Sequence, residues 1–132
     1  MPVAGVVDAL ERIHRALADG GVVVDTQPVS ARPRVVGADG ELGTLDMREW
    51  SKTIAAVDAE IVSTVDRGLF AVTADRQIVV IDVYDDLGEL VETTRDWLGT
   101  SVPRELARQV DGSGGEVRLH QDVRVRVLER RV

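Results

Sequence analysis

The closing segment of the chain, residues 117–127, constrains the fold more than any other feature. Apolar and polar side chains alternate strictly along it, the pattern of a strand with one face covered and the other in solvent. Gln121 is the one polar residue in the apolar row, so we expect a bend or bulge there. The segment predicts a half-exposed antiparallel strand whose charged row consists of Arg118, His120, Asp122, Arg124 and Arg126.

Amphipathic segments upstream predict helices. Apolar residues recur at helical spacing over about residues 3–18, and again from Asp46 as far as Gly68, where glycine favours a helix end. Asp46 and Asp86 are each followed three residues later by glutamate, the capping-box spacing that opens a helix. A further short helix is expected after Pro103.

Between these helices lie short β-branched runs. Residues 22–24 and 78–83 are apolar on both faces, which is typical of strands buried on both sides of a parallel sheet. Residues 70–72 indicate a short strand or the approach to one. An Asp-Gly dipeptide within residues 34–45 predicts a small hairpin with a tight turn.

The alternation of helices with strands favours an α/β fold. We expect one domain, residues 1–132, with a mixed, mostly three-stranded sheet plus the small hairpin, flanked by helices. Only 3% of the residues are aromatic, so the core must consist of valine, leucine, isoleucine and alanine.

Composition excludes several classes of function. The chain has no cysteine, which rules out disulfides, thiolate nucleophiles and cysteine-based zinc sites. A formal net charge of −7 argues against binding nucleic acid or an anionic membrane surface. No apolar run approaches the roughly 20 residues that cross a bilayer, and no secretory signal pattern is present. We therefore expect a cytoplasmic protein.

Residues 9–25 resemble the late part of class I S-adenosylmethionine-dependent methyltransferases. They read Ala-Leu-Glu-Arg-Ile-His-Arg-Ala-Leu-Ala-Asp-Gly-Gly-Val-Val-Val-Asp. In that family a similar helix runs through two glycines into the fifth strand of a Rossmann-like sheet, although Asp19 stands where the family usually has proline. The resemblance implies that residues 78–83 form the sixth strand. It also implies that residues 117–127 form the antiparallel seventh, between the fifth and the sixth.

This resemblance covers most of the chain but only the second half of the family's domain. The family binds its cofactor through the first strand, a glycine-rich loop and the acidic end of the second strand. Those elements would precede Met1, so the resemblance transfers no cofactor-binding residue and implies no cofactor for this chain alone. The implied fold is a partial Rossmann-like methyltransferase topology.

The strand-end rule supplies a candidate ligand site, because ligands of open α/β sheets bind beyond the carboxyl ends of the strands. Here that place holds Asp25 and Gln27, with two arginines just beyond, at Arg32 and Arg34. We find no catalytic constellation. A metal site is also not expected, since the two histidines of the chain are far apart in the sequence.

Three functions remain open at this point. The first is a non-catalytic, methyltransferase-derived domain that self-associates or binds a protein partner. The second is a methyltransferase fragment whose cofactor half lies upstream or on another chain, and the third is a small-ligand-binding α/β domain. For the first function we expect a homodimer in which two copies of residues 22–25 pair antiparallel, because that strand lacks its family neighbour. Apolar side chains of the first helix would join this interface: Val6, Leu10, Ile13 and Leu17.

Overall fold

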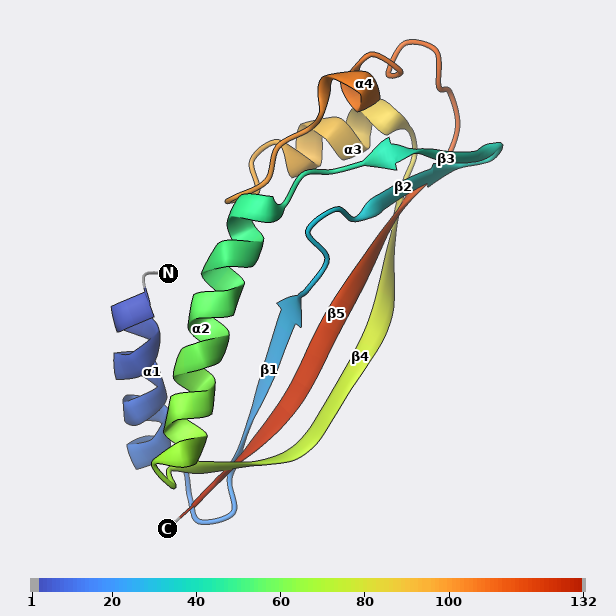
Figure 1. The fold of residues 1–132 in the computed structure, drawn as a ribbon. Helices are drawn as coiled ribbons and strands as arrows, with labels where there is room; N and C mark the ends of the chain where they lie inside the picture. Colours follow the sequence, from blue (N-terminus) through green and yellow to red (C-terminus); the bar gives the residue numbers. More distant parts are fainter. Residues whose placement is uncertain (1–2, 132) are drawn as a thin grey trace. The chain divides into compact units, whose positions relative to one another are not determined.

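The computed structural model describes residues 3–131, without the side chains of Val3, Ala4, Val6 and Val7. The expected contribution of Val6 to an interface therefore lies outside the described residues. The described residues form the following elements in chain order (Figure 1): α1 (Val3–Ala16), β1 (Val22–Pro28), β2 (Arg34–Gly37), β3 (Gly40–Thr44), α2 (Arg48–Asp66), β4 (Phe70–Tyr84), α3 (Leu87–Thr94), α4 (Arg104–Ala107) and β5 (Val117–Arg130).

The five strands form one antiparallel sheet. Their order is β1-β5-β2-β3, and β4 also pairs with β5. The β2–β3 hairpin joins this sheet because β2 pairs antiparallel with β5, with Val35 opposite Leu119. The mixture of helices and strands, the hairpin and the antiparallel last strand are confirmed. The expected parallel pairing is wrong, and the sheet has five strands where three plus a separate hairpin were expected.

Strands β1 and β4 differ from the expectation in burial as well. The expected short strands at 70–72 and 78–83 are one continuous strand, β4. Its apolar stretch is exposed, and so are Val22 and Val24 of β1, which are 51% and 61% exposed. In the described part of the chain, β1 and β4 each pair with β5 alone. Apolar residues on both faces of these strands therefore do not mark burial between two layers, as they would in a parallel sheet.

The backbone forms two compact units, and β4 and β5 contribute residues to both. Of the described residues, unit 1 comprises 3–27, 52–78 and 124–131, and unit 2 comprises 28–51 and 79–123. In unit 1, α1 and α2 run side by side (Figure 1) and enclose a core of Leu10, Ile61, Phe70 and Leu128. In unit 2, α3, α4, the hairpin and β5 enclose an aliphatic core of Val35, Leu45, Leu87, Leu90, Val91, Leu106, Val117 and Leu119.

Several of the predicted turns and helix caps are present in the structure. Gly68, two residues after α2, has φ of 77°, and Gly20 has the same φ in a turn that follows α1 by four residues; this conformation favours glycine. The Asp86 carboxylate accepts the Glu89 N–H at 2.8 Å and caps α3. The expected capping box at Asp46 does not form. Helix α2 begins at Arg48, whose N–H donates to Asp46 Oδ1 at 3.1 Å, and the Asp46 backbone forms an isolated bridge with Ser101.

The alternation of buried and exposed side chains along β5 shifts by one residue between the two units. The odd-numbered Val117, Leu119 and Val123 are buried in unit 2, whereas the even-numbered Arg126 and Leu128 are buried in unit 1. A single charged face does not therefore run the length of the strand. The expectation that Arg126 belongs to an exposed charged row is wrong. No helix in the described residues is long and apolar enough to cross a membrane.

Candidate functional site

The structure divides the four residues of the expected ligand site between the two units. Asp25 and Gln27 lie together on β1, where Gln27 Nε2 donates to Asp25 Oδ1 at 2.9 Å. Arg32 and Arg34 belong to unit 2 and are exposed. Asp25 is not free to bind a ligand, because its Oδ2 atom accepts hydrogen bonds from Arg126, at 3.1 Å from Nε and 2.9 Å from Nη2.

Arg126 is the centre of an ion cluster within unit 1. Its side chain is only 2% exposed, and its Nη2 atom also contacts Oδ1 of Asp58 on α2. That buried oxygen has no aligned hydrogen-bond donor in the described residues, so the contact is an ion pair rather than a directed hydrogen bond. A buried guanidinium requires such partners, because an unpaired charge there would be very costly.

The neighbouring arginine of β5 extends the cluster to a third carboxylate. Arg124 donates to both oxygens of Asp75 on β4, at 3.0 and 2.7 Å, and to Asp58 Oδ2 at 3.3 Å. The bidentate hydrogen bond lowers the pKa of Asp75 and raises the pKa of Arg124. The cluster thus joins β1, α2, β4 and β5 through two cations and three anions that are already paired. Its chemistry is structural, and it offers no free charge to a ligand.

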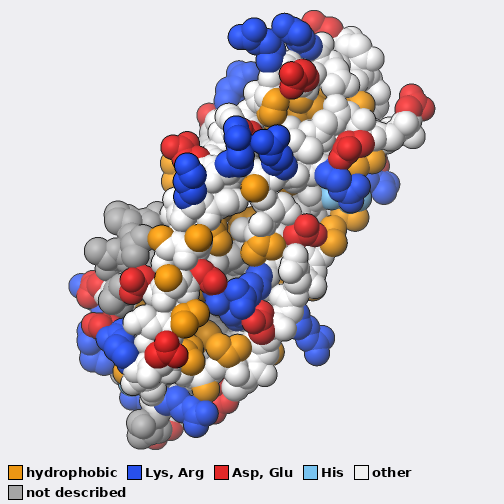
Figure 2. All heavy atoms as spheres, viewed as in Figure 1, with side chains coloured by type: hydrophobic (Ala, Val, Ile, Leu, Met, Phe, Trp, Pro, Cys, Tyr) orange, Lys and Arg blue, Asp and Glu red, His pale blue; other side chains and the backbone are white. Residues whose placement is uncertain are grey.

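Two further arginines of β5 are also paired. Arg118 contacts Glu116 at 3.1 Å, and Arg130 contacts Asp19 at 2.5 Å. Figure 2 shows basic and acidic side chains interspersed over the visible face, which agrees with this internal neutralisation. The arginines of this strand therefore do not form a free anion-binding row. The sequence contained one usable signal for the cluster, the carboxylate of Asp25 after an apolar run, but the expectation that Asp25 ends the strand is wrong, because β1 continues to Pro28.

The exposed apolar stretch of β4 is the most unusual surface in the structure. Ile78, Val79, Ile81 and Val83 are 47%, 57%, 46% and 57% exposed, although all four belong to one strand. Single exposed aliphatic residues are ordinary on protein surfaces, but a contiguous group indicates an interaction site. Sequence reasoning missed this surface because it assigned the same residues to a buried strand.

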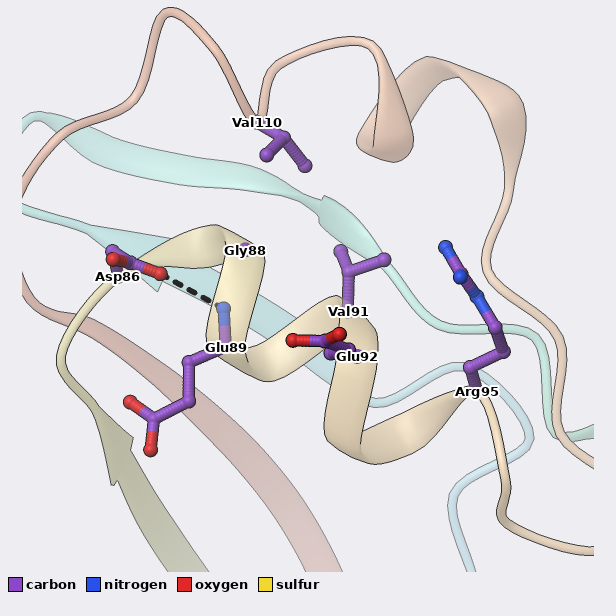
Figure 3. Close-up of a pocket in the computed structure, with 7 residues that line it drawn as sticks. All are labelled: Asp86, Gly88, Glu89, Val91, Glu92, Arg95 and Val110. Carbon is purple, nitrogen blue, oxygen red and sulfur yellow. Dashed lines mark hydrogen bonds between the residues drawn. The ribbon is translucent and has the colours of Figure 1, made fainter.

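A hollow on the surface of α3 carries charged side chains but does not form a site. It is lined by Asp86, Glu89, Glu92 and Arg95, with Val110 opposite. Figure 3 shows that the three carboxylates lie apart and do not converge on one point. Asp86 caps the helix, and Glu89 Oε2 accepts the Asp85 N–H at 2.7 Å. Helix capping accounts for two of these acids, and the described residues contain no cluster of side chains suited to a metal ion.

A second hollow, in unit 2, is apolar and contains both tryptophans of the chain. Trp50 and Trp97 line it together with the buried Met47, and Gln121 of β5 contributes an amide. Sequence reasoning noted Gln121 as an anomaly in an apolar row but did not connect it with the tryptophans. No protein-family model, curated protein or solved structure matches the chain.

Proposed function

We propose that this chain is a non-catalytic, self-associating domain, and that the edge strand β4 pairs with β4 of a second copy. The observation that carries the proposal is the exposure of Ile78, Val79, Ile81 and Val83 on one strand. Pairing two such strands removes aliphatic surface from water and satisfies backbone groups at the same time.

The edge of β4 is suited to such pairing. Within the described residues β4 pairs with β5 alone, which leaves N–H and C=O groups along its other edge without a strand partner. Soluble proteins protect edges of this kind with short strands, prolines, bulges or charged residues. Strand β4 is 15 residues long, and residues 78–83 contain a single charge, at Asp82. An edge so weakly protected is a template for another strand.

A second copy of the chain fits this edge because the strand is complementary to itself. In an antiparallel pair centred on Val79, Arg76 of each copy lies opposite Asp82 of the other. Directly opposed side chains have Cβ atoms about 5 Å apart, which allows two ion pairs across the two-fold axis. Ile78 would face Val80 in the same register. Moving the centre to Val80 would instead place Asp82 opposite Ile78.

Arg76 is available for this role. It is exposed and forms no ion pair with the described residues, in contrast to Arg124 and Arg126 of β5. Asp82 accepts one long hydrogen bond, 3.4 Å from Gln121 Nε2, and its carboxylate can accept others. Opposite charges in this register favour a second copy over an unrelated apolar strand.

Light scattering coupled to size exclusion tests the proposal at micromolar concentration. We expect a dimer for the wild type and a monomer for Val79→Lys/Ile81→Lys. Losing burial of two aliphatic side chains per copy removes roughly 1.5–3 kcal/mol for each, which weakens association more than about a hundredfold. The matched control is Val24→Lys on β1, at an equally exposed valine. A monomeric wild type would overturn the proposal.

The control also tests the alternative pairing through β1. If Val24→Lys dissociates the dimer and the β4 variant does not, the two copies pair through residues 22–25. Charge exchange then tests the register: Arg76→Asp or Asp82→Arg alone should weaken the dimer, and the double exchange should restore it. Equal effects of single and double exchanges would reject the register centred on Val79.

Descent from methyltransferases stays a prediction from the sequence. The family's sheet is mainly parallel, so the antiparallel sheet adds no support to that descent or to a methyltransferase fragment. Self-association through β4 does not depend on either one. Calorimetric titration with S-adenosylmethionine addresses the fragment directly, and we expect no binding tighter than about 50 μM, equivalent to roughly 6 kcal/mol.

A further inference from the structure

The apolar hollow of unit 2 has a lining without charge. It encloses about 300 Å³ between Pro28, Met47, Trp50, Trp97, Leu98, Thr100 and Gln121. The chain has four aromatic residues in total, and its two tryptophans both lie here. Trp97 also packs against the aliphatic core, yet neither indole is fully buried. Leu98 at the same hollow is 75% exposed.

Backbone hydrogen bonds hold the two tryptophan-bearing segments together. Asp46 and Ser101 exchange N–H···O bonds of 3.0 and 2.8 Å, and Trp50 N–H donates to Gly99 O at 3.3 Å. Gly99 has φ of 65°, and a Cβ atom at this position would lie 2.7 Å from the Trp50 nitrogen. Only glycine allows this close approach, so the backbone segments that carry the two tryptophans are held next to each other.

The remaining walls are held in the same way. Met47 N–H donates to Ala31 O at 2.7 Å, which ties the start of α2 to the segment after Pro28. Val29 N–H donates to Asp122 O at 2.9 Å and so ties that segment to β5 beside Gln121. Backbone hydrogen bonds therefore hold together the segments that carry the lining side chains, which favours a preorganised binding site.

Gln121 supplies the polar contact of the hollow. Its Nε2 atom donates to Asp82 Oδ2 at 3.4 Å, and among the described residues no donor reaches its Oε1 atom. An amide oxygen without a donor, next to two indoles and a thioether, suits a ligand that is apolar, aromatic and carries one N–H or O–H group. Charged ligands are disfavoured, because no lining side chain could neutralise them.

We propose that this hollow binds a small, neutral, planar aromatic molecule with one hydrogen-bond donor, and that Gln121 accepts its hydrogen bond. The volume lies at the lower end of the range for small-molecule sites, which corresponds to one or two fused rings. No residue of β4 lines the hollow, so the site does not require self-association, although Gln121 also contacts Asp82 of β4.

Titration with indole, followed by ¹H–¹⁵N correlation spectra, tests the site. Trp50 and Trp97 give the only indole N–H resonances of the protein, so both should shift in a saturable way. We expect a dissociation constant on the order of 0.1–1 mM for a ligand of this size. The experiment uses the wild-type protein as its parent and is repeated on Val79→Lys/Ile81→Lys, so that a failure of self-association does not affect its outcome.

The role of Gln121 has its own control. N-Methylindole lacks the donor and should bind about tenfold more weakly than indole to the parent protein. Gln121→Leu should abolish that preference, whereas His120→Gln, at the preceding residue of β5, should retain it. Unchanged tryptophan resonances at 5 mM indole would overturn the site. An equal affinity for both probes in the parent, or a preference that persists in Gln121→Leu, would overturn the role of Gln121.

Discussion

The two units of this protein bury different chemistry. The core of unit 2 is aliphatic, and its buried members from Val35 to Leu119 contact one another without any charged side chain among them. Unit 1 has a core of Leu10, Ile61, Phe70 and Leu128, and beside it an arginine that is 2% exposed. Unit 2 thus depends mainly on apolar burial, whereas unit 1 also depends on correct charge pairing.

Removing the buried cation should produce the largest effect. Arg126→Ala leaves Asp25 without its strongest donor and Asp58 without one of its two cations. Breaking a buried ion pair by removing one partner costs about 3–5 kcal/mol. We expect a loss of that size in the free energy of unfolding, measured by urea denaturation at pH 7.

The matched control lies on the same strand. Arg118→Ala removes an arginine whose ion pair with Glu116 is exposed, and such pairs contribute about 0–1 kcal/mol. A rescue sharpens the contrast: Arg126→Leu combined with Asp25→Val should recover part of the loss, because it removes both charges of one ion pair while Asp58 keeps only Arg124 as a cation. Equal losses for Arg126→Ala and Arg118→Ala would mean that unit 1 does not depend on the cluster.

The same contrast explains which features could be predicted from the sequence. The end of α2 near Gly68, the hairpin and the Asp86 cap depend on a few adjacent residues, and each was predicted correctly, whereas α1 ends at Ala16, before the expected end near residue 18. The burial of a strand depends on which layers cover it, and that is a non-local property. Residues 78–83 and Arg126 were therefore assigned to the wrong environments.

The candidate surfaces show the same limit. Gln121 was recognisable as a polar residue in an apolar row, but its neighbours in the hollow come from residues 28, 47–50 and 97–100. Only the fold brings these segments together. Likewise, the carboxylate that follows the apolar run 22–24 indicated a special environment at Asp25, although Asp25 lies inside β1 and its partner Arg126 is 101 residues away in the chain. Recognising that pair from sequence requires the strand order.

A smaller effect is expected at the cap of α3 in unit 2. The Asp86 carboxylate accepts the Glu89 N–H, so Asp86→Ala leaves a helix N-terminal donor without its side-chain partner. Such a change costs about 1 kcal/mol, less than the loss of Arg126, because the exposed N–H can bond to water instead. Urea denaturation measures it, with Glu92→Ala on the same helix as the control. A loss above about 3 kcal/mol would show that unit 2 also depends strongly on a polar contact.

The smallest effect concerns acid sensitivity at the start of α2. Hydrogen bonds from the Arg48 side chain and backbone lower the pKa of Asp46 to about 2, from an ordinary value of 3.8. A carboxylate with a lowered pKa stabilises the fold above its unfolded pKa, and this stabilisation is lost as the pH falls from about 4 to about 2. Asp46→Asn should therefore reduce the free energy of unfolding at pH 7 but not at pH 2.

The exposure of this ion pair limits the size of that difference, since solvent screens it. Asp75 of unit 1 provides the comparison, because Arg124 lowers its pKa in the same direction. Asp75→Asn should likewise reduce the loss of unfolding free energy as the pH falls. It should also disturb the ion cluster at neutral pH. Urea denaturation from pH 2 to pH 7 separates the two variants. If the stability curves of Asp46→Asn and the wild type run parallel over this range, the Asp46–Arg48 contact does not contribute to acid sensitivity.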